Sequence, residues 1–359
     1  MTATYWLLAD VGGTNIRLAL MPSEDRLFAD KLLEQQQALA SERRYLWSSY
    51  PTLQNAIEVL FADLGVNASA VVGAVIAVAG PVVAGKDHFE FTNVDRGFRR
   101  SELKSFLKTD RVYIINDYQA QGMVIPLVRT MPNRLTTIYD APGNPMGAIG
   151  VLGPGTGLGV AAVYPPGSNP MVKAEATLVV PGEGGHVALG ARVRTVQELL
   201  PFMQASLEAF RFNSTDSDKS ATLRYEDVLS GFGLQCVHGA LCLRNGRAPI
   251  WPSPDALSSS ALDDHDPLAL ETFAVFFDVL AQACSDVALQ YLSNGGVYIT
   301  GGIVPKNLGL LDRQRFADIF QDSWRSQKFL AQIPVHVVTS SSSGLSGAAV
   351  FAASIVTSR

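Results

Sequence analysis

The chain has 359 residues, of which 47% are hydrophobic and 17% are charged, and its formal net charge is −5. This length exceeds what one hydrophobic core comfortably organises, so we expect two domains, and the composition excludes an intrinsically disordered protein. The negative balance and the lack of a basic run argue against nucleic acid and anionic membranes as partners.

Three features of the chain predict a cytoplasmic protein. Cys236, Cys242 and Cys284 form neither a CxxC pair nor a zinc spacing, which suits a reducing compartment. The N-terminus lacks a basic segment and reaches a predicted strand within a few residues, so no signal peptide is expected. The longest apolar stretch, residues 268–292, carries acidic and glutamine side chains at intervals, and we therefore predict a core helix rather than a membrane span.

The first predicted element is a hairpin over residues 7–20, in which two apolar runs flank the pair Gly12-Gly13. Paired glycines allow a tight turn that brings backbone N–H groups against an anion. Asp10 precedes the glycines, and an aspartate at the end of a strand can hold Mg²⁺ beside phosphates. The pattern indicates a phosphate and metal site, although an ordinary hairpin with a Gly-Gly turn has a similar local sequence.

Helix and strand patterns alternate over the rest of the first part of the chain. Residues 51–64 repeat apolar side chains at helical spacing and stop at Gly65, whereas residues 71–78 and 112–115 are apolar runs typical of buried parallel strands. A short strand or loop is predicted at residues 89–93, and a helix at residues 101–107. This alternation predicts βαβ units and a mostly parallel sheet.

The second part of the chain repeats the opening pattern, with a strand at residues 148–152, a glycine turn at 153–159 and a strand at 160–164. Further predicted elements are a helix at 195–212, where Thr195 and Glu198 have capping-box spacing, a helix starting within 224–231, a helix at 268–292 and a strand at 297–300. The tail, residues 340–356, is predicted to be a Ser/Gly loop followed by an alanine-rich helix. Residues 213–221 and 247–267 are polar and are predicted to be surface insertions. Two halves that each open with a glycine-turned hairpin suggest an internal duplication around a central cleft.

Asn116 and Asp117 stand where a predicted strand ends and a helix begins, which is where ligands bind in α/β sheets. The helix dipole favours an ionised carboxylate there. A carboxylate that reaches a hydroxyl group is the base needed for phosphoryl transfer to an alcohol. The alternative is that Asp117 only caps the helix.

Residues 181–186 place one carboxylate and one imidazole, Glu183 and His186, among small residues. Such a loop can press its backbone against a polar ligand while both side chains form hydrogen bonds, and the alternative is a flexible glycine loop. No further His or Cys is spaced for a metal site, and Glu226 by itself has only the features of a solvated helix charge.

The glycine turn at residues 153–159 matches neither the dinucleotide fingerprint nor the Walker A pattern. A phosphate loop without a lysine would rely on backbone N–H groups and Mg²⁺ to neutralise the phosphates.

Six motifs, however, occur in the order found in bacterial-type glucokinases: residues 10–17, 116–118, 153–159, 181–186, 226–231 and 301–305. The chain thus resembles these members of the actin/hexokinase/heat-shock-chaperone ATPase superfamily over nearly its whole length. The resemblance implies a two-domain α/β fold, actin/hexokinase-like (ribonuclease H-like), with a central cleft. It implies a smaller α/β domain of residues 1–126 and 342–359 and a larger α+β domain of residues 127–341.

The resemblance also implies ATP-dependent phosphorylation of D-glucose at O6 to glucose 6-phosphate, the entry to glycolysis, by a homodimer that uses ATP and Mg²⁺. It implies that Asp117 is the general base for the C6 hydroxyl and that Asp10 organises the metal. The implied glucose ligands are Asn93, Asn116, Asp117, Glu183, His186 and Glu226. The implied ATP-binding residues are Asp10, Val11, Gly12, Gly13, Thr14, Asn15, Gly155, Thr156, Gly157, Gly301 and Gly302, with residues 344–347 beside the adenosine.

The chain departs from the family pattern at three points: no tryptophan follows Asn93, Tyr118 replaces a more usual phenylalanine, and the tail is serine-rich where an Asn-Pro-Gly form is commoner. It also lacks the cysteine-rich zinc loop of repressor-type sugar kinases. The alternatives are a kinase of another hexose (mannose, fructose or an N-acetylhexosamine), a sugar-binding regulator without catalysis, and an ATPase-driven interaction protein of the actin type. Retention of Asp10 and Asp117 argues against the regulator, and the loop at residues 181–186 argues against the third alternative.

Overall fold

The structure is a computed structural model that describes residues 3–24, 41–83, 85–91, 96–168, 177–212, 222–339 and 344–357. The chain divides into two compact units, one formed by Met1–Pro132 with Ser342–Arg359 and the other by Asn133–Ser341. The domain boundary expected at residue 126 lies inside helix α4 (Asp117–Val128), whereas the observed division follows Pro132.

The first unit is built on a five-stranded sheet of order β3-β2-β1-β4-β7. Its strands are β1 (Tyr5–Val11), β2 (Asn15–Pro22), β3 (Arg43–Leu46), β4 (Val71–Val78) and β7 (Val112–Asn116). Strand β2 is antiparallel to both of its neighbours, while β1, β4 and β7 run parallel to one another. A separate hairpin is formed by β5 (His88–Phe91) and β6 (Arg96–Arg99).

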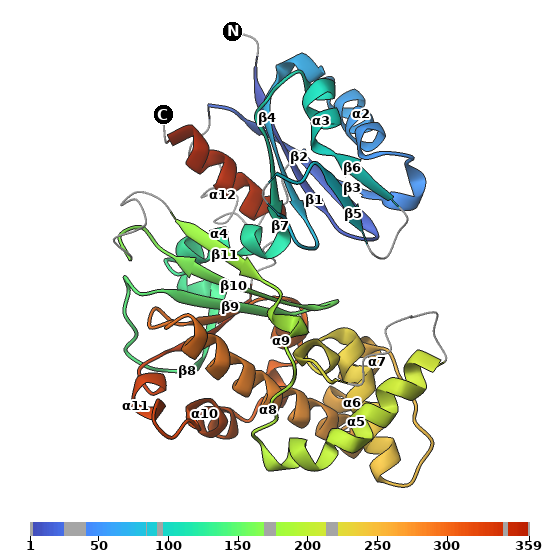
Figure 1. The fold of residues 1–359 in the computed structure, drawn as a ribbon, viewed down its shortest axis with the longest axis vertical. Helices are drawn as coiled ribbons and strands as arrows, with labels where there is room; N and C mark the ends of the chain where they lie inside the picture. The colour runs from blue at the N-terminus through green and yellow to red at the C-terminus, as the bar shows by residue number, and fades with distance from the viewer. Residues whose placement is uncertain are drawn as a thin grey trace. The chain divides into compact units, whose positions relative to one another are not determined.

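Helices cover both faces of this sheet. Successive side chains of β1 point to opposite faces, so neighbouring residues show what packs on each. Leu7 packs in a cluster with side chains of α2 (Leu53–Leu64) and α3 (Arg100–Leu107), whereas Leu8 packs in a cluster with α12 (Gly344–Thr357). Figure 1 shows α2 and α3 on one side of the strands and α12 on the other. Helix α2 begins at the N-cap Thr52 and ends at Gly65, where the sequence predicted its end, and the φ of 64° at Gly65 is left-handed.

The second unit contains a six-stranded sheet of order β11-β10-β9-β12-β13-β8. Its strands are β8 (Leu135–Tyr139), β9 (Ile149–Pro154), β10 (Leu158–Tyr164), β11 (Leu178–Gly182), β12 (Val297–Ile299) and β13 (Val335–Val338). Strand β10 is antiparallel to both neighbours, and β9, β12 and β13 are parallel. The order β11-β10-β9-β12-β13 and its strand directions therefore repeat β3-β2-β1-β4-β7 of the first unit, as expected for the predicted internal duplication. Strand β8 adds a sixth strand beyond β13.

The helices of the second unit form the rest of its core. They are α5 (Arg194–Phe212), α6 (Gly231–Arg244), α7 (Pro254–Leu262), α8 (Pro267–Gln290), α9 (Ile303–Lys306), α10 (Arg313–Gln321) and α11 (Gln327–Leu330). Among the described residues, α8 alone is long and apolar enough to cross a membrane, but 83% of its apolar window is buried inside the protein. It is thus the core helix that the sequence predicted.

Three local predictions for this unit fail or go untested. Thr195 is not a cap: it lies one residue inside α5, and its hydroxyl donates to the buried carboxylate of Asp278, which also binds Arg315. Residues 247–267 are more than a surface insertion, because α7 lies within them, starts at the N-cap Ser253 and buries Leu257. The other predicted insertion, residues 213–221, lies outside the described residues.

Candidate active site

The turn between β1 and β2 is held by the backbone and by one distant tryptophan. The N–H of Gly12 donates to the carbonyl oxygen of Asn15 at 3.0 Å. The buried Trp47 donates its indole N–H to the Gly12 oxygen at 2.9 Å and its backbone N–H to the Thr14 oxygen at 3.0 Å. Thr14 and Asn15 are exposed. The predicted phosphate turn is therefore fixed in shape while these two side chains face solvent.

Asp10 lies two residues before Gly12, and its charge is incompletely compensated. Its side chain is 21% exposed, Arg17 approaches within 3.6 Å, and the backbone N–H of Gly344 at the start of α12 donates to it. Burial nevertheless raises the pKa of Asp10, and this effect exceeds the lowering by Arg17 and by the Gly344 hydrogen bond. A cation bound at this carboxylate would offset the cost of its ionisation.

The donor set at Asp10 fits Mg²⁺ bound through phosphates. Mg²⁺ usually takes one or two carboxylates, keeps several waters and binds substrate phosphates. Within the described ranges no group of three His, Cys, Asp or Glu side chains is placed to cage a metal by itself. A single carboxylate beside a glycine turn is within the range of arrangements that hold such a substrate-bound ion.

The structure decides which of Asn116 and Asp117 caps helix α4. Asn116, 7% exposed, is the N-cap of α4: its Oδ1 accepts from the N–H groups of Tyr118 and Gln119 at 2.9 and 3.2 Å, and its Nδ2 donates to the Gly80 oxygen at 2.9 Å. The interpretation of Asp117 as the cap is therefore wrong. Asp117 is the first residue of α4, is half-buried, and accepts the Tyr118 N–H through Oδ1 at 2.9 Å.

Asp10 and Asp117 lie at the same edge of the first sheet. Val11 is in register with Val78, which is in register with Asn116, and the three strands are parallel. Two strand spacings separate β1 from β7 by about 10 Å. The carboxyl edge of this sheet thus carries the predicted metal ligand and the predicted base at the ends of β1 and β7, with β4 between them.

Two glycines of residues 344–347 pack closely against other elements of the first unit. A Cβ on Gly344 would lie 2.6 Å from the Asp10 carboxylate, and a Cβ on Gly347 would lie 1.9 Å from the Ala120 oxygen. Both glycines are buried. They let α12 approach the end of β1 and the first turn of α4, which carries Asp117.

In the second unit, Glu226 supports the glycine turn between β9 and β10. Its Oε2 accepts the Leu158 N–H at 2.7 Å, and a Cβ on Gly157 would lie 2.5 Å from the same oxygen. The turn is also tied to α6, because the Gly231 N–H donates to the Gly155 oxygen at 2.9 Å. Thr156 lies between these two anchored glycines and is exposed. Glu226 is thus more than a solvated charge.

The structure brings Glu183 and His186 to the segment that carries Glu226. The Tyr225 N–H donates to the Val187 oxygen at 3.1 Å, so the two segments run side by side. The Glu183 Oε2 and the His186 Nε2 are 3.8 Å apart, and each side chain is about half exposed (54% and 53%).

The glycines of this loop have a different cause from the one predicted. A Cβ on Gly184 would lie 2.6 Å from Val160, and a Cβ on Gly185 would lie 2.3 Å from the Leu158 oxygen. The loop therefore presses on strand β10. Glu183 and His186 are left at its exposed side.

A cavity of about 260 Å³ lies beside two of the predicted ATP-binding residues of this unit, Gly155 and Gly302. It is lined by Gly155, Leu234, Pro254, Asp255, Ser258, Gly302, Ile303, Lys306 and Asn307. Gly301, beside it, has a φ of 85°, and a Cβ there would lie 2.3 Å from the Pro154 oxygen. Helix α7, from the supposed surface insertion, forms one wall.

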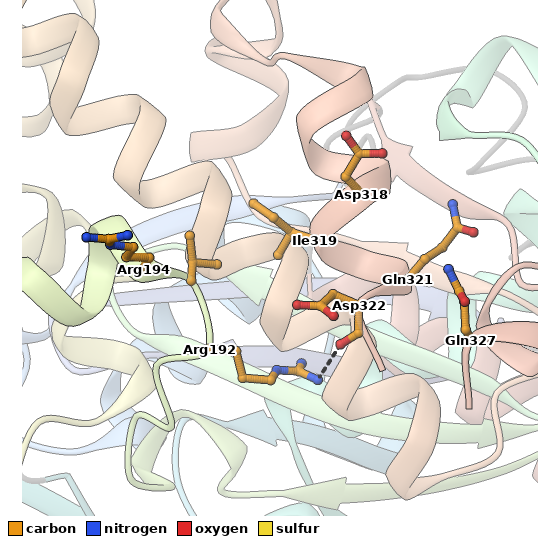
Figure 2. A pocket seen from close by; sticks show the side chains of 8 residues that line it. Arg192, Arg194, Asp318, Ile319, Gln321, Asp322 and Gln327 are labelled. Carbon is orange, nitrogen blue, oxygen red and sulfur yellow. Dashed lines mark hydrogen bonds between the residues drawn. The ribbon is translucent and has the colours of Figure 1, made fainter. Parts of the chain in front are cut away.

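A larger open pocket of about 550 Å³ lies elsewhere in the second unit, between the start of α5 and helices α10 and α11 (Figure 2). None of the predicted site residues lines it. Its Arg192 is engaged by Asp286 at 2.8 Å, and Figure 2 shows its further contact with the Asp322 backbone oxygen at 3.5 Å. We assign no part of the predicted chemistry to this pocket.

Sequence reasoning missed several residues of these sites. Trp47 carries no local signal, because its contact with Gly12 spans 35 positions. Asp255 and Lys306 form an ion pair at the cavity, but they are 51 positions apart. Asn307 is the second residue after the sixth motif and could have been suspected from that position alone. Asn93 lies outside the described residues.

Comparison with known proteins places these features in a class. Two copies of one sheet order, each opening with a glycine-turned hairpin, are the architecture of sugar kinases with the actin-like ATPase fold. A crystal structure of glucokinase from an Antarctic psychrotroph matches this fold with a TM-score of 0.76 and 26% identity, covering 99% of each chain.

The sequence comparisons are more specific. Glucokinase of Rhizobium etli (strain CIAT 652) is 32% identical over 347 residues, covering 96% of this chain and 91% of the relative. Glucokinase of Chromobacterium violaceum is 31% identical over 344 residues, covering 96% and 88%. The family model described as Glucokinase matches residues 7–355. The chain belongs to the glucokinase family, which confirms the predicted fold, the predicted enzyme class and glucose phosphorylation as its function.

Proposed function

We propose that this chain transfers the terminal phosphoryl group of ATP to O6 of D-glucose and releases ADP and glucose 6-phosphate. The observation that carries the detailed proposal is the position of Asp117: it is the first residue of α4, on the sheet edge that also holds the Asp10 turn. Family membership supports glucose as the acceptor.

Asp117 acts as the general base. The O6 proton moves to its carboxylate as the bond from O6 to the γ-phosphorus forms and the bond from that phosphorus to the β–γ bridging oxygen breaks. The Tyr118 N–H holds Oδ1 of Asp117, and the cap by Asn116 fixes the helix start. A base positioned in this way contributes roughly 10²–10⁴-fold to the rate.

The phosphates are bound by backbone groups rather than by a lysine. The turn at Gly12, Gly13 and Thr14 and the turn at Gly155, Thr156 and Gly157 each offer a shape fixed by hydrogen bonds. When bound at Asp10, Mg²⁺ would neutralise charge on the phosphate oxygens. Asp10 holds this position through its contacts with Arg17 and the start of α12.

Glu183, His186 and Glu226 bind the sugar hydroxyls. Their segments lie side by side in the second unit, and Glu183 and His186 are half exposed, so they are available to a polar ligand. Each hydrogen bond from a hydroxyl to a charged group is worth about 1.5–3 kcal/mol, so a few of them reject sugars that lack or invert one hydroxyl.

The nucleoside end of ATP occupies the cavity beside Gly155 and Gly302. A volume of about 260 Å³ is below the roughly 300–1,000 Å³ of sites that enclose a whole ligand. It therefore suits one part of the nucleotide, with the phosphates leaving past Gly155. Leu234 and Ile303 supply apolar wall, and Asp255 and Lys306 supply polar wall.

The test is a coupled ADP-release assay with Mg²⁺ and a panel of hexoses at equal concentration. We expect glucose to give the highest kcat/KM among glucose, mannose, fructose and N-acetylglucosamine. A higher kcat/KM for another hexose would show that this hexose, and not glucose, is the preferred substrate. Glucose binding by calorimetry without ATP-dependent turnover would favour the regulator instead.

We further propose that the enzyme works in the cytoplasm as a homodimer and feeds glycolysis. The three cysteines are buried free thiols, which suits a reducing compartment. The homodimer rests on the resemblance to the family, and light scattering on the purified protein measures it. A monomeric mass at micromolar concentration would contradict it.

A further inference from the structure

A buried hydrogen-bond network attaches the segment that carries Glu226 to the core helix α8. Tyr225 directly precedes Glu226 and is 6% exposed. Its hydroxyl donates to the carboxylate of Asp286 and accepts from the Gln282 Nε2 at 2.6 Å. Gln282 and Asp286 lie on successive turns of α8. The residue before Glu226 is therefore fixed to the core helix through its side chain.

The same glutamine attaches the segment that follows His186. Gln282 is 1% exposed; its Nε2 also donates to the Gly190 oxygen at 2.5 Å, and its Oε1 accepts the Arg192 N–H at 2.7 Å. A primary amide has two N–H donors, so Tyr225 and Gly190 together use both. A flipped amide would place its oxygen against the Gly190 oxygen. These contacts therefore fix the orientation of the amide.

The two attached segments also pair with each other. Residues 187–189 and 223–225 run antiparallel and are joined by two backbone hydrogen bonds, at 2.8 and 3.1 Å. His186 and Glu226 are the next residues at the same end of this pairing. A two-stranded pairing of this length is only marginally stable by itself. The side-chain contacts with α8 therefore determine where its end lies.

We propose that Tyr225 is a positioning residue for sugar recognition, whose hydroxyl lets α8 hold Glu226 beside His186 in the arrangement that selects the acceptor hexose. This inference rests on the proposed function, in which Glu183, His186 and Glu226 bind the sugar hydroxyls. Tyr225 acts through these residues, because its own hydroxyl is already engaged by α8. Selection between sugars that differ at one hydroxyl depends on where the hydrogen-bonding groups stand.

The surroundings of Tyr225 allow its hydroxyl to be removed without stranding a charge. Burial raises the pKa of Tyr225, and the hydrogen bond to Asp286 adds to this effect, so the hydroxyl stays a donor at neutral pH. Asp286 also accepts from the Arg192 guanidinium at 2.8 Å, and its side chain is 31% exposed. Its carboxylate therefore keeps a cationic partner and access to water when the tyrosine hydroxyl is absent.

The test is Tyr225→Phe, which keeps the ring and removes the hydroxyl. Calorimetry without nucleotide should show the glucose Kd raised by about tenfold, the scale of one hydrogen bond to a charged group. The kcat/KM preference for glucose over mannose should narrow by a similar factor. At saturating glucose, kcat and the KM for ATP should stay within about threefold of wild type. Asp117 lies in the other unit, and the hydrogen bond from the Leu158 N–H to Glu226 is retained.

Tyr139→Phe is the matched control. Tyr139 is a half-buried tyrosine of the same unit, and its hydroxyl donates to the Ala331 oxygen at 3.2 Å, outside the network. This variant should keep the wild-type glucose Kd and hexose preference.

Asp286→Asn tests the same contact from the other side, and it replaces Tyr225→Phe if that variant fails to fold. It keeps the shape of the side chain and removes the charge that the Tyr225 hydroxyl contacts. Because both substitutions act on one hydrogen bond, the double variant should bind glucose no more weakly than the weaker-binding single variant.

Three results would overturn the inference: an unchanged glucose Kd and hexose preference in Tyr225→Phe and Asp286→Asn, an equal loss in Tyr139→Phe, or a lowered kcat with an unchanged glucose Kd. A wild-type protein that binds no hexose would contradict the proposed function, and this inference with it. A wild-type enzyme that phosphorylates glucose, with variants that bind glucose equally well, would contradict the inference alone.

Discussion

Gly347→Ala tests whether the approach of α12 to α4 positions the catalytic edge. An alanine Cβ would lie 1.9 Å from the Ala120 oxygen and 2.2 Å from its carbonyl carbon, whereas real Cβ atoms essentially never approach within 3.0 Å. The helices must therefore separate by about 1.1 Å (3.0 minus 1.9), because the obstacle is backbone and cannot rotate away.

The expected loss in the free energy of unfolding is the difference between two opposing effects of Gly347→Ala. Overpacking of a well-packed contact costs about 1–3 kcal/mol, and a backbone obstacle places this case near the upper end. Replacing glycine by alanine inside a helix stabilises the helix by about 1 kcal/mol. We therefore expect the free energy of unfolding of the first unit to fall by about 2 kcal/mol. Since α4 carries Asp117 in its first turn, kcat should also fall.

Urea unfolding followed by tryptophan fluorescence measures the stability, and the coupled assay measures kcat. Gly190→Ala is the control, because a Cβ there meets nothing within 4 Å and surface substitutions of this kind stay within about 0.5 kcal/mol. A Gly347→Ala protein with wild-type stability and wild-type kcat would refute the reasoning.

Two further substitutions each probe one predicted site residue, Asp10 in the first unit and Glu226 in the second. Because burial raises the folded-state pKa of Asp10 above its ordinary value of 3.8, its ionisation favours unfolding: its stabilising contribution is present below pH 3.8 and is lost as the pH rises through the folded pKa. Asp10→Asn should therefore raise the melting temperature at pH 7 without Mg²⁺, give no gain near pH 3, and abolish most turnover; equal melting temperatures at pH 7 would contradict this. Glu226→Ala removes the acceptor of the Leu158 N–H and should raise the KM for both ATP and glucose, by about tenfold for the loss of one charged hydrogen bond, whereas Glu226→Gln keeps an acceptor and should preserve the KM for ATP. An unchanged KM for ATP in Glu226→Ala would show that Glu226 does not support phosphate binding by the turn at residues 155–157.

The elements that the sequence predicted well are those encoded by near neighbours. Residues 71–78 form β4 because an unbroken apolar run suits a strand buried on both faces, and α2 stops at Gly65 because glycine readily adopts the left-handed turn. Both glycine-turned hairpins were likewise visible locally. The local sequence could not show which of Asn116 and Asp117 caps helix α4, because both residue types cap helices. The pairing of Asn116 with Val78 places the end of β7 at Asn116, and Asn116 is therefore the cap.

What the sequence did not reveal depends on contacts between distant segments. From the sequence, Gly184 and Gly185 were assigned only to ligand binding, because their close packing against strand β10 is a contact between distant segments. Glu226 looks solvated until the turn at Gly157 closes on its carboxylate. Residues 247–267 look like a surface insertion because they are polar overall, yet Leu257 and Ala261 are buried in the core of the second unit.

The most direct test of the account is Asp117→Asn, with glucose binding and turnover measured on the same sample. Asparagine keeps the shape of the side chain and an oxygen that can accept the Tyr118 N–H, so α4 should start unchanged. The account predicts a glucose Kd within about threefold of wild type and a kcat lowered by about 10²–10⁴-fold. A variant that binds glucose and retains near wild-type kcat would contradict the role of Asp117 as the base.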